Sequence, residues 1–79
     1  EGRIGAIGGI DQKMYASLHH GAQLFLAPAE NCDDLVHGTP AGLRVTPVHT
    51  LSEAVKVLNN FKAGKPLPTV NSVCSKKEK

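Results

Sequence analysis

Seventy-nine residues can form at most one small domain with a marginal hydrophobic core. Apolar residues make up 41% of the chain, which is typical of a folded protein, and the net charge is only +2. Aromatic residues make up 4%, so the chain offers no stacking platform for nucleic acid bases. Before residue 62 the acidic residues outnumber the basic ones, which excludes a phosphate-binding stripe in that part of the chain.

Short apolar runs alternate with amphipathic segments along the chain. They predict, in order, a strand, a helix, a strand, a short helix, a strand and a helix. The expected ranges are residues 3–7, 11–20, 23–27, 31–36, 43–48 and 51–63. Such alternation favours an α/β fold with a largely parallel sheet.

Start and stop signals support these boundaries. Gly21 suits the position just after a helix, and Asn31 is expected to cap the short helix that follows it. Thr50 and Glu53 have the spacing of a capping box. Pro47 places the third strand at a sheet edge or marks its end, because proline cannot donate to a ladder.

Lys13 stands in the first turn of the first predicted helix, shortly after Gly8 and Gly9. The helix macrodipole puts partial positive charge at that end, which disfavours an ammonium group. A neutral amine can accept a proton from a hydroxyl nucleophile, so Lys13 is a candidate general base. A lysine in the first turn of an amphipathic helix is otherwise a solvated charge.

Residues 8–13, with the sequence GGIDQK, resemble the segment of the Lon-type serine proteases that carries the lysine of a Ser–Lys dyad. In that family the lysine follows a strand and a Gly-Gly turn, three residues after the aliphatic residue that succeeds the glycines. Residues 21–31 look like the next strand of the family with its Pro-x-x-Asn exit. Residues 42–45 and 50–54 look like its last strand and last helix, whereas Ala6 stands where the family often has proline.

The closest likeness is to the membrane-anchored Lon-like proteases of Gram-positive bacteria that carry a PDZ domain. It implies that residues 1–63 are the C-terminal part of a larger Lon proteolytic domain, with residues 64–79 as an irregular basic tail. The function implied is peptide-bond hydrolysis by a serine endopeptidase. The family's nucleophilic serine precedes the lysine by several dozen residues, so it would lie upstream of Glu1. Lys13 would be the catalytic base, and the isolated 79-residue chain would be inactive.

The resemblance also implies the setting of the reaction. No metal and no organic cofactor are expected. The expected partners are a protein or peptide substrate and the upstream rest of the protease domain, and the protein could form a homo-oligomer. The parent protein would be anchored upstream, on the extracytoplasmic face of the bacterial membrane. The alternative is a non-catalytic α/β module for peptide binding or assembly, with a degenerate dyad.

Cys32 and Cys74 belong to no C-x-x-C pair, and no histidine stands at zinc-finger spacing from either. They are free thiols in a reducing compartment or a disulfide that ties the tail to the body outside the membrane. The resemblance to extracytoplasmic proteases favours the disulfide.

Other candidate sites have simpler explanations. The early glycines do not follow a nucleotide-binding pattern and are interpreted as turn residues. Ser17 is expected to be a solvent-facing helix serine, and Asp33 and Asp34 interact with a helix dipole. The adjacent histidines His19 and His20 point to different faces of a helix, which is poor geometry for one metal. Five lysines stand in the last eighteen positions and are interpreted as solvated rather than bound to lipid or nucleic acid: Lys62, Lys65, Lys76, Lys77 and Lys79.

Overall fold

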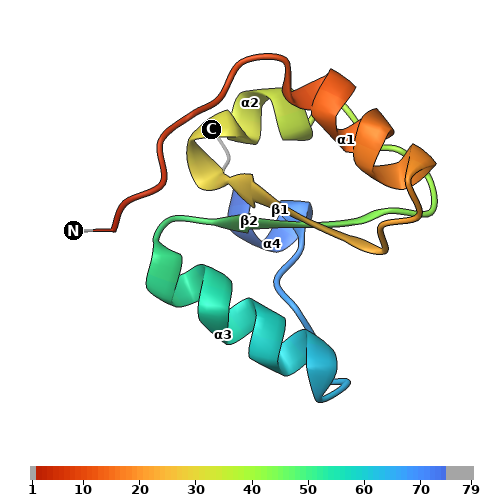
Figure 1. The fold of residues 1–79 in the computed structure, drawn as a ribbon. Coiled ribbons are helices and arrows are strands. Elements are labelled where there is room, and N and C mark those ends of the chain that lie inside the picture. Colours follow the sequence, from red (N-terminus) through yellow and green to blue (C-terminus); the bar gives the residue numbers. More distant parts are fainter. Residues whose placement is uncertain (1, 75–79) are drawn as a thin grey trace.

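Two short parallel strands form the centre of the molecule, with helices on both sides of them (Figure 1). The computed structural model describes residues 2–74. Its elements are α1 (Ile10–His19), β1 (Leu24–Pro28), the 3-10 helix η1 (Ala29–Asn31), α2 (Cys32–Leu35), β2 (Arg44–Val48), α3 (Leu51–Lys62) and α4 (Val70–Cys74). Helices and a parallel sheet confirm the expected α/β fold class.

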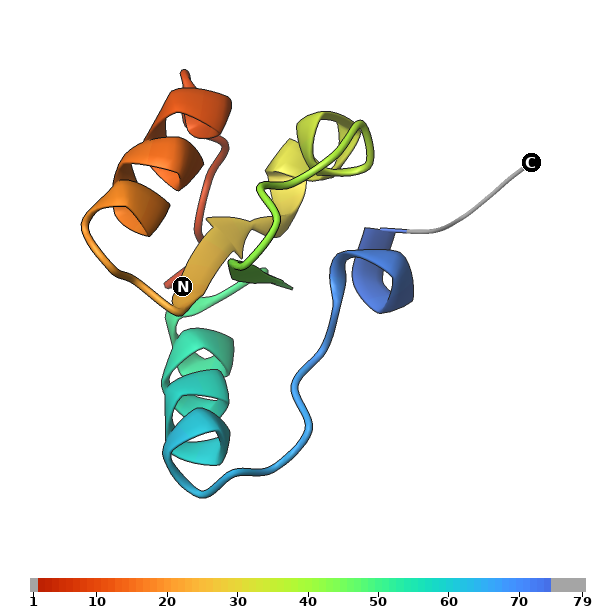
Figure 2. The same ribbon diagram turned by 90° about the vertical axis from the view of Figure 1, so that its right-hand side faces the viewer.

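The two faces of the sheet carry different helices. Figures 1 and 2 show α1 and α2 on one side of the strands and α3 on the other. Side chains alternate along a strand, so Phe25 and Val45 enter the core on the α1 side, while Val48 faces α3. The buried residues of the core cluster are Ile10, Met14, Ala27, Leu35, Leu43, Val45 and Cys74.

Helix α1 lies within one residue of its expected boundaries. Ile10 and Met14 are buried, so the predicted apolar stripe is the face that packs on the core. At its C-terminal end Gly21 has φ 89°, and the Ala22 amide donates to the Ser17 carbonyl at 3.0 Å. This is the Schellman arrangement, in which only glycine adopts the left-handed backbone at low cost.

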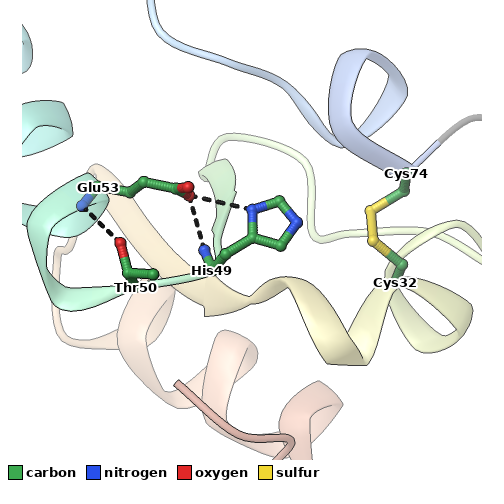
Figure 3. Close-up of polar contacts among 5 residues, drawn as sticks. All are labelled: Cys32, His49, Thr50, Glu53 and Cys74. Carbon is green, nitrogen blue, oxygen red and sulfur yellow. Dashed lines mark hydrogen bonds and ion pairs between the residues drawn. A yellow bond between two sulfur atoms is a disulfide. The ribbon is translucent and has the colours of Figure 1, made fainter. Parts of the chain in front are cut away.

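Helix α3 begins with half of the expected capping box (Figure 3). The Thr50 hydroxyl accepts a hydrogen bond from the Glu53 amide at 3.1 Å, as predicted. The Glu53 carboxylate, however, accepts from the His49 amide at 2.8 Å instead of that of Thr50. The cap is therefore displaced by one residue and draws His49 into the helix start.

Residues 3–7 do not form the predicted strand. Arg3 makes one isolated antiparallel bridge with Thr50, and the rest of the segment has no ladder. The reason is that its backbone groups bind separate partners: the Ile4 amide donates to the His49 carbonyl at 2.9 Å, and Ile7 pairs with the Asn31 side chain. Strand propensity without a neighbouring strand gives only an extended segment.

The expectation of an irregular tail from residue 64 is wrong for Val70–Cys74, which form α4. The Ser72 amide donates to the Thr69 hydroxyl at 3.1 Å, and the Thr69 amide donates to the Ser72 hydroxyl at 2.8 Å. This reciprocal pair is a capping box with serine in the place of glutamate. Residues 75–79 of the predicted tail lie outside the described part of the chain.

A disulfide joins Cys32, the first residue of α2, to Cys74, the last residue of α4 (Figure 3). The Cα atoms are 5.3 Å apart, within the range that a disulfide spans. The staple inferred for these cysteines is therefore confirmed. No helix within residues 2–74 has both the length and the apolar character of a membrane span.

The double variant Cys32→Ser/Cys74→Ser should be less stable than the oxidised protein. The cysteines are 42 residues apart, and closing such a loop in the unfolded chain corresponds to about 4 kcal/mol in free energy of unfolding. Urea titrations of both proteins measure the difference. Reductant should shift the midpoint of the wild type and leave that of the variant unchanged; equal midpoints for oxidised and reduced wild type would contradict the expectation.

Candidate functional site

The N-terminal segment passes over the carboxyl ends of both strands. Ile4 bonds to His49, just after β2, and the Ala6 amide donates to the Glu30 carboxylate at 3.2 Å, just after β1. Carboxyl ends of parallel strands are where open α/β sheets bind their ligands. The segment therefore delivers the start of α1 to the edge of the sheet where a functional site is expected.

Gly9 makes the turn into α1. It is the residue before the helix, with φ 63° and ψ 34°, a left-handed conformation that costs other residues energy. A Cβ atom there would lie 3.2 Å from Oε1 of Gln12 and 3.8 Å from Nζ of Lys13. At Gly8 a Cβ atom would meet nothing within 4 Å. Glycine is thus favoured at position 9 by the left-handed turn, and a Cβ atom there would also crowd Oε1 of Gln12, whereas it would make only an ordinary contact with Nζ of Lys13.

The side chain of Lys13 folds back over the start of its own helix. Its Nζ donates a hydrogen bond to the Gly8 carbonyl at 2.9 Å, and its backbone amide donates to the Gly9 carbonyl at 3.0 Å. The residue is exposed. The amine is therefore accessible but fixed by one acceptor, and as a neutral group it would keep a lone pair for a proton.

Asn31 is the residue that sequence reasoning misassigned. It precedes α2 as predicted, but its side chain makes no cap bond. It is 4% exposed, and its amide group pairs with the backbone of Ile7 in both directions at 3.0 Å. The available signal was its place three residues after the end of a strand, where a side chain can reach a segment that crosses the sheet edge.

The cavity beside this turn is small and open. It has a volume of about 280 Å³ and is lined by Gly9, Ile10, Asp11 and Gln12 of the α1 start and by Asp34 of α2. A larger hollow of about 380 Å³ lies elsewhere, between β2 and the segment that leads into α4, and Lys13 does not line it.

The other predicted candidates do not converge on Lys13. Ser17 lies one turn further along α1, while the amine points the opposite way, towards Gly8. The rings of His19 and His20 are 6.0 Å apart, and His37 contacts the Asp33 carbonyl. Within residues 2–74 no three histidine, cysteine or acidic side chains gather as metal ligands do.

His49 and Glu53 form an ion pair at the start of α3. Nδ1 of His49 lies 3.1 Å from Oε1 of Glu53, and both side chains are largely exposed (Figure 3). The hydrogen bonds from the backbone and side chain of His49 lower the pKa of Glu53 below its ordinary 4.5. The pair belongs to the N-terminal cap of α3, so we expect it to stabilise the start of that helix.

No family model matches this chain, and no solved structure matches it either. The case for a function therefore rests on the turn that holds Lys13 and on the surfaces around it.

Replacing Gly9 by alanine should destabilise the protein by about 1–2 kcal/mol, because a left-handed backbone strains any residue with a Cβ atom. Gly8→Ala is the matched control, since its φ is not positive and its Cβ would meet open space. Chemical denaturation of both variants makes the comparison. Equal losses at the two positions would show that the turn does not depend on the backbone of Gly9.

Replacing Glu53 by glutamine should lower stability at neutral pH, and the loss should shrink in acid. A lowered pKa means that the carboxylate stabilises the fold fully above pH 4.5, and that this contribution disappears as the pH falls through the lowered value. Thermal unfolding between pH 7 and pH 3 tests this, with Asp33→Asn of α2 for comparison. A loss that stays constant over the whole range would rule out the His49–Glu53 bonds as its cause.

Proposed function

We propose that this chain is the lysine-bearing part of a Lon-like serine endopeptidase with a Ser–Lys dyad. The nucleophilic serine would be supplied by the upstream part of the same protease domain. Its hydroxyl oxygen would attack the scissile carbonyl carbon while its proton passes to Nζ of Lys13. The Lys13 ammonium would then return that proton to the leaving amine. Backbone amides near the serine would stabilise the oxyanion.

The observation that carries this proposal is the position of the Lys13 amine. An exposed lysine ordinarily extends into solvent, where its entropy is greatest. Here Nζ turns back onto the Gly8 carbonyl at 2.9 Å, at the start of its own helix. A general base needs such a fixed position within reach of the hydroxyl that it deprotonates.

Uncovered apolar surface supports the idea that further polypeptide packs on this chain. Within residues 2–74, β1 pairs with β2 alone, so its other edge has no strand. On the side of α3, Leu51, Val55 and Leu58 are 61%, 57% and 42% exposed, although they continue the apolar stripe of the helix. The occupant that we propose is the upstream part of the protease domain.

The disulfide supports a setting outside the cytoplasm, because such bonds persist in oxidising compartments. We therefore place the proposed protease on the extracytoplasmic face of a bacterial membrane, reached through an anchor upstream. Its substrate would be a protein or peptide, and no nucleic acid is involved.

A second candidate is a non-catalytic module for assembly or peptide binding. The same exposed residues of α3 favour it, since an apolar helix face of this kind also fits an interface between proteins. The two proposals differ in Lys13. In an assembly module its amine has no chemical task, whereas in the protease it is indispensable.

In the complete protease, Lys13→Arg and Lys13→Ala should both fold and both lose activity by about 10²–10⁴-fold. Guanidinium keeps the positive charge but stays protonated at working pH, so arginine cannot serve as the base. Peptide hydrolysis at several substrate concentrations measures the effect. Lys56→Arg on α3 is the matched control and should leave turnover unchanged. Near-normal turnover by Lys13→Arg would end the dyad proposal in favour of the module.

A further inference from the structure

The side chain of Asn31 is held by three hydrogen bonds that leave it one orientation. Its Oδ1 accepts from the Ile7 amide at 3.0 Å, and its Nδ2 donates to the Ile7 carbonyl at 3.0 Å. Nδ2 also donates to Oδ2 of Asp34 at 3.1 Å. A flipped amide would set an oxygen against both the carboxylate of Asp34 and the carbonyl of Ile7, so these two acceptors together determine which way the group points.

These bonds reach the site through the backbone. The Ile7 amide and the Ile7 carbonyl belong to the two peptide groups on either side of that residue, so Asn31 holds both of them. The next carbonyl along the chain is that of Gly8, which accepts the hydrogen bond from Nζ of Lys13. Asn31 comes 24 residues after Ile7, directly before α2. The position of the Gly8 carbonyl thus depends on a side chain from a different element.

We infer that Asn31 is a positioning residue for the amine of Lys13. The catalytic importance of this role rests on the proposed function, whereas the positioning itself is argued only from the hydrogen bonds. A neutral amine has two N–H groups and one lone pair. When one N–H bonds to a fixed Gly8 carbonyl, the directions open to the lone pair are restricted. Asn31 sets that restriction by holding the peptide groups that precede Gly8.

Two variants test the inference. Asn31 is 4% exposed and its bonds to Ile7 are partly buried, so we expect that removing its side chain loosens the turn and also lowers stability. Asn31→Ala removes the three bonds at once. Asp34→Ala removes only the bond to Asp34, at an exposed position. It replaces Asn31→Ala as the test if Asn31→Ala does not fold.

The first measurement uses the 79-residue chain and needs no activity. NMR relaxation of the ¹³Cε of Lys13 reports how restricted the amine end of the side chain is, with Lys56 of α3 as an exposed reference. Lys13 should be more restricted than Lys56 in the wild type and equal to it in Asn31→Ala; Asp34→Ala should give an intermediate value. Asn59→Ala on α3 is the matched control. Unchanged Lys13 relaxation in a folded Asn31→Ala or Asp34→Ala protein would overturn the inference.

The second measurement uses the complete protease. Asn31→Ala should lower kcat by about 10²-fold with little change in KM, the scale expected when a catalytic group is misplaced by about 1 Å. If relaxation responds but Lys13→Ala keeps full activity, the proposed function fails and the positioning of Lys13 stands. If Lys13→Ala is inactive while Asn31→Ala changes neither relaxation nor kcat, the positioning inference fails and the dyad stands.

Discussion

The covalent bond between Cys32 and Cys74 is the constraint on which the described fold most depends. Helix α4 has only five residues, too few to persist on its own in water. Yet it supplies part of the hydrophobic core, because Cys74 is buried and Val70 and Val73 pack against the same cluster. The bond keeps this short helix against α2 and β2. A chain of this size has few other means of closing its core.

The elements that could be predicted are those specified by neighbouring residues. The apolar stripe of α1 recurs every four positions, and the glycine after its end permits a left-handed backbone. The cap of α3 depends on Thr50 and a residue three positions later. Such signals act over one helical turn, so the chain displays them whatever the rest of the fold does. The parallel pairing followed from the order of the elements, which restricts the connections available.

What sequence reasoning missed depends on partners far along the chain. Asn31 looked like a helix cap, which is the local use of an asparagine, but its side chain bonds to a peptide group 24 residues earlier. Residues 3–7 have the composition of a strand, but within residues 2–74 their only pairing is the single bridge from Arg3 to Thr50. Helix α4 was overlooked because Ser72 replaces the glutamate of the usual capping box. The place of Lys13 at the start of a helix could be predicted from local residues, whereas the bend of its side chain onto the Gly8 carbonyl could not.

The register of β2 determines at which edge another strand can pair with the sheet. The Arg44 amide donates to the Gln23 carbonyl of the segment before β1. Backbone N–H and C=O groups of successive residues in a strand point to opposite edges, so those of Thr46 and Val48 also face β1. Those of Val45 and Pro47 face away from it. Since proline has no N–H group, Val45 alone could donate from the middle of the outer edge of β2. That edge is a poor template for another strand, which protects it from pairing with a second molecule. A strand that extends this sheet therefore finds more backbone donors along the edge of β1, where Leu24 and Leu26 face outward, than along that of β2.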